Sequence, residues 1–134
     1  MADALRVVLV DDEDLVRSGL RLLLSNAPDI EVVAEASNGR DAVATVLDTQ
    51  PDVVLMDIRM PVMDGIAAVE KILSVHAVPI IMLTAFDTDS FILRALRAGA
   101  AGFLLKSTPP ESLMAAVRAA AAGQPLLSPQ VVDK

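Results

Sequence analysis

The stretch VVLMDIRMPVMDG, residues 53–65, contains the pattern that decides the fold. It begins with a short apolar run, Val53–Met56, which is typical of a strand buried on both faces of a sheet. Asp57 follows this run directly, and Gly65 closes the stretch at a position typical of a loop. Apolar residues then recur at helical spacing, at Ile66, Val69 and Leu73. The stretch therefore predicts a buried strand, a loop and a helix in succession.

The same alternation extends over most of the chain. Short β-branched and apolar runs predict five strands, at Arg6–Val10, Ile30–Glu35, Val53–Met56, Val78–Leu83 and Gly102–Leu105. Five stretches with helical spacing separate and follow these runs, and Gly99 has a position typical of a glycine that ends a helix. This strict strand–helix order predicts an α/β fold with a parallel five-stranded sheet, right-handed crossovers and helices on both faces.

The length and composition restrict the architecture and the function. A chain of 134 residues with 54% apolar content is long enough for one domain with its own core. The pattern stops after Gly123, so we expect a domain over residues 1–123 and the start of a linker over residues 124–134. The chain has no cysteine and a single histidine, which excludes disulfides and multi-histidine metal sites within it.

The charge and the apolar runs also bear on partners. The net charge is −7, no basic run exists, and the chain lacks Trp and Tyr, so we do not expect it to bind DNA or RNA itself. No apolar run approaches the roughly 18 residues that cross a bilayer. The first residues do not resemble a signal peptide. We therefore expect a cytoplasmic protein without a membrane partner.

Polar side chains stand at the ends of four predicted strands. The first strand is followed by the acidic run Asp11–Asp14 and the third by Asp57, while the fourth leads to Thr84 and the fifth to Lys106. Ligands bind outside the carboxyl ends of parallel strands, so we expect these side chains to share one crevice. Taken singly, each has an ordinary interpretation: an acidic helix N-terminus capped by Asp14, a turn residue, a structural threonine and a solvated lysine. Their coincidence at four strand ends favours a functional site.

The chemistry of this crevice indicates phosphoryl transfer. Carboxylates at Asp11, Asp12 and Asp57 would repel one another, so one must be protonated or a cation must neutralise them. Oxygen ligands select a hard cation, and Mg²⁺ suits a site with few carboxylates. In this set Asp57 could attack phosphorus, while the cation and Lys106 stabilise charge on the phosphoryl oxygens and Thr84 offers a hydroxyl donor.

At these residues the chain resembles the receiver domain of bacterial two-component response regulators, over about residues 5–122. The resemblance is carried by four motifs, VVLVDDED, VVLMDIRMPVMDG, IIMLTAF and AAGFLLKS. It implies a (βα)5, flavodoxin-like receiver fold with strand order 2-1-3-4-5. It also implies a switch that is phosphorylated by a sensor histidine kinase and that catalyses only its own phosphorylation and dephosphorylation.

The resemblance implies a role for each polar residue of the site. Asp57 is the expected phosphoacceptor. Asp12 and Asp57 are expected to bind Mg²⁺ directly, together with the backbone carbonyl of Arg59, while Asp11 acts through metal-bound water. Lys106 is expected to contact the phosphoryl group.

Two further pairs of residues are implied to control the switch and its lifetime. Thr84 is expected to move and hydrogen-bond the phosphoryl group, and the aromatic Phe103 to reorient with it. Arg59 and Phe86 lie two residues beyond Asp57 and Thr84, at positions that border the path of the hydrolytic water in the family. We expect this bulky pair to slow dephosphorylation.

The segments GFLLKST and LLSPQVV resemble the NarL/LuxR-type subgroup of this family. Many receivers have a proline directly after the lysine, whereas this chain has Ser107. Members of the subgroup usually continue into a helix-turn-helix domain, so we expect a transcription regulator that contacts DNA only through a C-terminal domain absent from this chain. A stand-alone receiver in a phosphorelay is the alternative.

The last predicted helix favours contact with another helix. Its alanines would allow close approach, and three arginines lie nearby in the expected fold: Arg17, Arg21 and Arg118. We expect a phosphorylation-promoted symmetric dimer through the first and fifth helices, or through the fourth and fifth. The simpler interpretation is that alanine is the best helix former.

Three other classes of protein fit these residues less well. A haloacid-dehalogenase-like phosphatase needs a second aspartate two residues after the nucleophile, where this chain has Arg59. A flavodoxin-like or dinucleotide-binding module needs a phosphate-binding first loop, where this chain has Asp11–Asp14. A phosphorylation-independent interaction module usually lacks the acceptor, the acidic pair or the lysine, all of which are present.

Overall fold

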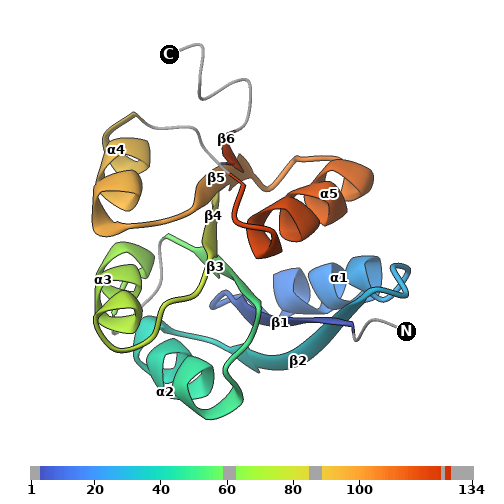
Figure 1. Ribbon diagram of the computed structural model, residues 1–134, viewed down its shortest axis with the longest axis horizontal. Helices are drawn as coiled ribbons and strands as arrows, with labels where there is room; N and C mark the ends of the chain where they lie inside the picture. Colours follow the sequence, from blue (N-terminus) through green and yellow to red (C-terminus); the bar gives the residue numbers. More distant parts are fainter. Residues whose placement is uncertain (1–3, 59–62, 85–88, 125, 128–134) are drawn as a thin grey trace.

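The computed structural model describes residues 4–58, 63–84, 89–124 and 126–127. Five strands alternate with five helices, and a short sixth strand follows (Figure 1). The elements are β1 (Leu5–Val10), α1 (Asp14–Leu24), β2 (Ile30–Ala36), α2 (Gly39–Thr49), β3 (Val53–Asp57), α3 (Gly65–Val75), β4 (Ile80–Thr84), α4 (Asp89–Ala98), β5 (Gly102–Leu105), α5 (Pro110–Ala121) and β6 (Leu126–Leu127). The predicted α/β fold is confirmed.

The strands form one sheet in the order β2-β1-β3-β4-β5-β6, and all neighbouring pairs are parallel. The implied order 2-1-3-4-5 is therefore confirmed. Helices α1 and α5 cover one face of the sheet, and α2, α3 and α4 cover the other (Figure 1). None of the helices in the described ranges is long and apolar enough to cross a membrane.

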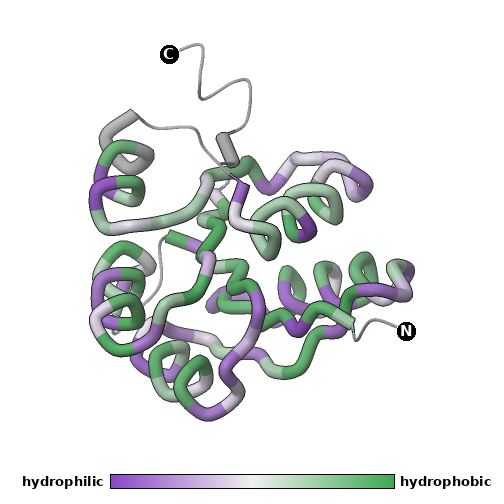
Figure 2. Tube along the Cα trace, in the orientation of Figure 1, coloured by the Kyte–Doolittle hydropathy of each residue, from purple (hydrophilic) through white to green (hydrophobic). Residues whose placement is uncertain are grey.

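The core has two layers because successive side chains of a strand point to opposite faces. Val8, Val54 and Met82 belong to the layer beneath α2, α3 and α4. Val7 and Leu55 belong to the layer beneath α1 and α5. The central strands β3 and β4 are buried along their whole length, which explains their near-continuous apolar sequences (Figure 2).

The sheet continues beyond the point where the sequence pattern predicted its end. Leu126 and Leu127 pair with Gly102 and Phe103 of β5, so part of the predicted linker is an edge strand. Gly123 has a positive φ of 80°, which turns the chain after α5, and the Gln124 N–H bonds the carbonyl of Ala119. Without β6, the outer edge of β5 would present unpaired backbone groups.

The helix ends confirm one expectation and correct another. Gly99 follows α4 with a φ of 111°, as predicted for a glycine that ends a helix. Asp14 does not cap α1, because Glu13 occupies the cap position and Asp14 is the first helical residue. The Asp14 carboxylate instead pairs with Arg17, one turn further on. The acidic start of α1 still suits the positive end of the helix dipole.

Candidate functional site

The sheet brings the four predicted strand ends to one edge. Asp11 directly follows β1, Asp57 is the last residue of β3, Thr84 is the last residue of β4, and Lys106 directly follows β5. In the register of the sheet, Asp57 lies beside Leu83 and Thr84 lies beside Leu105. Strands β1, β3, β4 and β5 are consecutive neighbours, so their carboxyl ends meet in one place. The predicted meeting of these strand ends at one edge of the sheet is confirmed.

A lysine lies between two buried carboxylates at this edge of the sheet. The Lys106 Nζ is 2.9 Å from Asp11 Oδ2 and 3.3 Å from Asp57 Oδ2. Asp11 and Asp57 are only 2% and 7% exposed, whereas Asp12 is exposed to solvent. Single carboxylate oxygens of Asp11, Asp12 and Asp57 all lie within 4.8 Å of one another. The site therefore combines three acidic groups with one ammonium group.

The burial of these groups changes their proton affinities. Burial raises the pKa of the Asp57 carboxyl above its ordinary value of 3.8; Lys106 opposes this effect, and the nearby charge of Asp11 adds to it. Burial lowers the pKa of Lys106, but its hydrogen bond to Asp11 and the charge of Asp57 outweigh burial, so the pKa rises. Lys106 is therefore held in its charged form.

The donor set fits a divalent cation. One ammonium group leaves the three carboxylates with net negative charge, and their oxygens are close enough together to contact one ion. Hard cations such as Mg²⁺ prefer carboxylate and carbonyl oxygens and retain several waters. The exposed Asp12 gives such an ion access from solvent. The site thus has an acidic cluster that could bind a metal.

The raised pKa of Asp57 predicts a cost of ionisation in the metal-free protein. The folded state binds the Asp57 proton more tightly than the unfolded state does. The contribution of Asp57 to the free energy of unfolding is therefore fully present below pH 3.8, and it is lost as the pH rises through the raised pKa. At pH 7 with a chelator, we expect Asp57→Asn to increase the free energy of unfolding, because the neutral amide carries no such cost and Lys106 keeps its closer partner Asp11.

Urea unfolding followed by circular dichroism would measure this effect, with the exposed Asp48→Asn as the charge-matched control. The advantage of Asp57→Asn should shrink as the pH falls through the raised pKa, because the wild-type carboxyl then becomes neutral. An Asp57→Asn protein that is no more stable than the wild type at pH 7 would contradict the prediction.

The backbone around Asp57 is closely packed. The Gly65 N–H donates to the carbonyl of Ile58 at 2.6 Å, and a Cβ added at Gly65 would lie 2.2 Å from the backbone oxygen of Asp57. Asp64 caps α3 through a bond from the Ala67 N–H to its side chain. The sequence pattern indicated Gly65 only as a loop residue, because an approach between backbones leaves no periodic signal.

The residues assigned to the switch lie in the core. Thr84 is 8% exposed, and its carbonyl accepts a hydrogen bond from the Lys106 N–H at 2.7 Å. Phe103 is fully buried in the layer beneath α2, α3 and α4. Arg59 and Phe86, which we expect to influence hydrolysis, lie outside the described residues. The expected Mg²⁺ ligand at the Arg59 carbonyl lies outside them too.

The fold and site define a response regulator receiver domain, and the comparisons with known proteins agree. A family model described as "Response regulator receiver domain" matches residues 7–118. The chain belongs to this family.

Similar proteins include transcriptional regulators and solved response regulators. The chain is 46% identical to YxjL of Bacillus subtilis (strain 168), an uncharacterized transcriptional regulatory protein, over 91% of the chain and 56% of that relative. It is 42% identical to the transcriptional regulatory protein LiaR of the same organism, over 97% of the chain and 62% of the relative. The chain thus spans about three-fifths of the length of these relatives.

Solved structures show the same fold. A LuxR-family two-component response regulator from Aurantimonas sp. SI85-9A1 superimposes with a TM-score of 0.91 at 36% identity, covering 98% of this chain and 94% of that one. The response regulator ChrA of a heme-sensing two-component system gives a TM-score of 0.85 at 41% identity, covering 98% and 64%. The resemblance to the LuxR-type subgroup is thereby confirmed.

Proposed function

We propose that the chain is a phosphorylation-activated switch that accepts a phosphoryl group on Asp57 from a sensor histidine kinase. The observation that carries the proposal is the arrangement around one buried carboxylate: Lys106 at 3.3 Å, Asp11 and Asp12 beside it, and Thr84 at the next strand end. In the full-length protein, this switch controls transcription through a DNA-binding domain outside this chain.

The chemistry assigns a separate task to each side chain. A carboxylate oxygen of Asp57 attacks phosphorus, and the bond between phosphorus and the donor nitrogen or oxygen breaks, so that the leaving group keeps the electron pair. Lys106 provides positive charge for the phosphoryl oxygens. Asp12 and Asp57, with the carbonyl of Arg59, would hold Mg²⁺ directly, and Asp11 would act through water. When bound, Mg²⁺ neutralises charge on the phosphoryl oxygens.

Phosphorylation would act on the rest of the domain through Thr84 and Phe103. The modified Asp57 carries a dianionic group with strong acceptor oxygens, and the Thr84 hydroxyl can donate to it if the following loop closes. Phe103 lies on the neighbouring strand and follows this movement. The phosphoryl group therefore biases a two-state element of the existing fold. Arg59 and Phe86 would limit water access and prolong this state.

The partners follow from the family and from the exposed surface. Receiver domains of two-component systems interact with histidine kinases. Helix α1 exposes Leu15 (84%) and Leu22 (71%), and an apolar groove of about 360 Å³ runs between α1 and α5. This surface favours α1 and α5 over α4 and α5 as the contact face of a phosphorylation-promoted homodimer. We place the protein in the cytoplasm and assign it no substrate beyond its own phosphoryl donor.

The arginines that the sequence assigned to this face are engaged within the chain. Arg118 of α5 makes two hydrogen bonds to Asp29, at 2.7 and 2.9 Å. Arg17 and Arg21 of α1 both pair with Glu35 of β2. A dimer through α1 and α5 would therefore rely on the leucines and the groove rather than on these charges.

Incubation with acetyl phosphate and Mg²⁺, followed by intact mass measurement, tests the proposed function. We expect a gain of one phosphoryl mass that requires Mg²⁺ and is absent in Asp57→Asn. If acetyl phosphate gives no gain, a histidine kinase is the second donor. Failure with both donors would overturn the proposal in favour of a phosphorylation-independent interaction module.

A further inference from the structure

The acidic loop after β1 is held by a residue outside the proposed reaction. Arg17 of α1 is only 14% exposed in its side chain, which is unusual for an arginine on a surface helix. Its Nη1 donates to the backbone carbonyl of Asp11 at 2.6 Å, and its Nε donates to Glu35 at 3.0 Å. Its Nη2 donates to Asp14. One planar guanidinium group therefore joins the acidic loop, α1 and β2.

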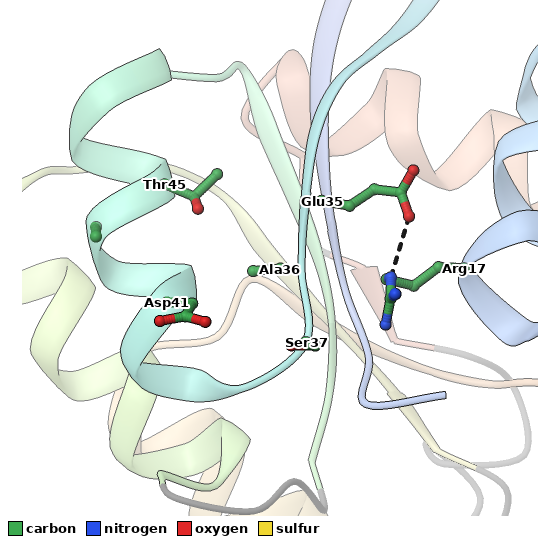
Figure 3. Close-up of a pocket in the computed structure, with 7 residues that line it drawn as sticks. Arg17, Glu35, Ala36, Ser37, Asp41 and Thr45 are labelled. Atoms are coloured by element: carbon green, nitrogen blue, oxygen red, sulfur yellow. Dashed lines mark hydrogen bonds and ion pairs between the residues drawn. The ribbon is translucent and has the colours of Figure 1, made fainter. Parts of the chain in front are cut away.

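Glu35 is itself held in place on the edge strand. Its second carboxylate oxygen accepts a hydrogen bond from Arg21 Nε at 2.6 Å. Figure 3 shows Arg17 reaching from α1 toward Glu35 on β2, with Asp41 and Thr45 of α2 on the other side of that strand. The anchor of Arg17 is thus a fixed carboxylate in the sheet.

These contacts determine the direction of the peptide between Asp11 and Asp12. The Asp11 N–H donates to the carbonyl of Ala36 at 3.1 Å, and the Asp11 carbonyl accepts from Arg17. The Asp11 side chain is held by the Glu13 N–H on one oxygen and by Lys106 on the other. Because a peptide group is planar, fixing its carbonyl also fixes where Asp12 begins.

We propose that Arg17 is a positioning residue for the metal-binding loop, which it orients through the Asp11 carbonyl so that Asp12 faces the ion. This inference rests on the proposed function, because it concerns the same Mg²⁺ site. Arg17 acts through the backbone and contacts neither the ion nor the phosphoryl group. Partners that orient metal ligands typically change metal affinity by about 10- to 100-fold when they are removed.

The sign of the effect separates positioning from charge. Loss of a positive charge near a cation site should by itself strengthen Mg²⁺ binding. Loss of positioning should weaken it. We therefore expect Arg17→Met to raise the Mg²⁺ dissociation constant about tenfold. Arg21→Met is the matched control, since it removes the same charge from the same helix and the same Glu35 but leaves the bond to Asp11 intact.

Isothermal titration calorimetry with MgCl₂ on the chelator-treated chain measures these constants, after circular dichroism has shown that each variant is folded. We expect Arg21→Met to bind within about twofold of the wild type. Arg17→Lys keeps the charge but cannot donate from a planar fork to three acceptors, so it should bind about threefold more weakly. This variant carries the test if Arg17→Met does not fold.

At saturating Mg²⁺, the rate of phosphorylation of Arg17→Met by acetyl phosphate should return to within about threefold of the wild type.

An Arg17→Met protein that binds Mg²⁺ as tightly as the wild type, or more tightly, would overturn the positioning role. Equal weakening in Arg17→Met and Arg21→Met would also overturn it, because the lost contact to Glu35, which both variants share, would then account for the effect. A wild-type chain that neither binds Mg²⁺ nor gains a phosphoryl group would overturn the proposed function itself, and this inference with it.

Discussion

Replacing Gly65 with alanine is expected to lower the free energy of unfolding by about 3 kcal/mol or more. An added Cβ would lie 2.2 Å from the Asp57 backbone oxygen, 2.8 Å from the Ile58 Cα and 2.9 Å from the Met82 Cε. Two of these atoms belong to the backbone of a buried strand end, which cannot rotate away as a flexible side chain can. The clash must therefore move α3 away from β3 or distort the peptide that carries Asp57.

The chain contains a matched control for this substitution. Gly19 lies inside α1, and an added Cβ would meet nothing within 4 Å. Alanine is a better helix former than glycine, so Gly19→Ala should stabilise the protein by about 0.5 to 1 kcal/mol. Urea unfolding followed by circular dichroism measures both variants. A Gly65→Ala loss below about 1 kcal/mol would show that the helix and strand can separate cheaply, contrary to this account.

The Gly65→Ala variant should also lose phosphorylation by acetyl phosphate under conditions in which the protein is still folded. The distorted peptide is the one that directs the acceptor carboxylate, and misplacement of a reacting group by about 1 Å can cost 100-fold in rate. The intact-mass time course measures this loss, with Gly19→Ala expected at the wild-type rate. If folded Gly65→Ala keeps the full rate of phosphorylation, the close packing at Gly65 does not direct the acceptor carboxylate.

Replacing Lys106 with methionine is the second change with a large expected effect. The Lys106 ammonium lies between Asp11 and Asp57, with its Nζ 2.9 Å from Asp11 Oδ2 and 3.3 Å from Asp57 Oδ2. Its removal leaves two buried carboxylates facing each other. Breaking a buried pair in this way typically costs about 3 to 5 kcal/mol. We expect that loss at pH 7 in a chelator, and a smaller loss at saturating Mg²⁺.

The same substitution should slow phosphorylation of Asp57 about 100-fold at saturating Mg²⁺, because a preorganised positive group no longer faces the phosphoryl oxygens. Lys71→Met is the matched control, since Lys71 is exposed on α3. Unfolding experiments measure stability, and the intact-mass time course measures the rate. A Lys106→Met protein with the wild-type rate would remove Lys106 from the proposed reaction.

A double variant tests whether the stability loss has the stated electrostatic cause. Adding Asp57→Asn to Lys106→Met removes one of the two facing carboxylates. It should therefore recover part of the lost stability, and the two changes should be non-additive by at least about 1 kcal/mol. Strict additivity would indicate that Lys106 contributes through packing of its aliphatic chain instead.

The sequence was sufficient to place the main site residues because the geometry of a parallel sheet converts order along the chain into proximity. Asp57, Thr84 and Lys106 each end or follow an apolar run, and parallel strands place all such positions on one edge. Burial of Phe103 also follows from its place within an apolar strand. Local periodicity therefore predicted the fold class, and it predicted most of the residues that meet at this edge of the sheet.

Contacts that depend on how the helices and strands pack together were beyond this reasoning. The bond from Arg17 to the Asp11 carbonyl, the approach of Gly65 to the Asp57 carbonyl and the pairing of β6 with β5 join groups whose meeting depends on how the helices pack on the sheet. The backbone carbonyls in these contacts have no sequence signature, since every residue has one. Likewise, the sequence indicated that Asp14 would cap α1, whereas Asp14 is the first helical residue and pairs with Arg17.

The amino-acid order thus specified which chemical groups stand at the strand ends, because alternation and burial are local properties of a strand. The packing of the folded chain decided how those groups are held. It determined which of them are buried, how close the Lys106 Nζ lies to the Asp11 and Asp57 carboxylates, and how the peptide between Asp11 and Asp12 is directed. Orientation depends on long-range hydrogen bonds and on the desolvation of charges, and both arise only when the helices close over the sheet.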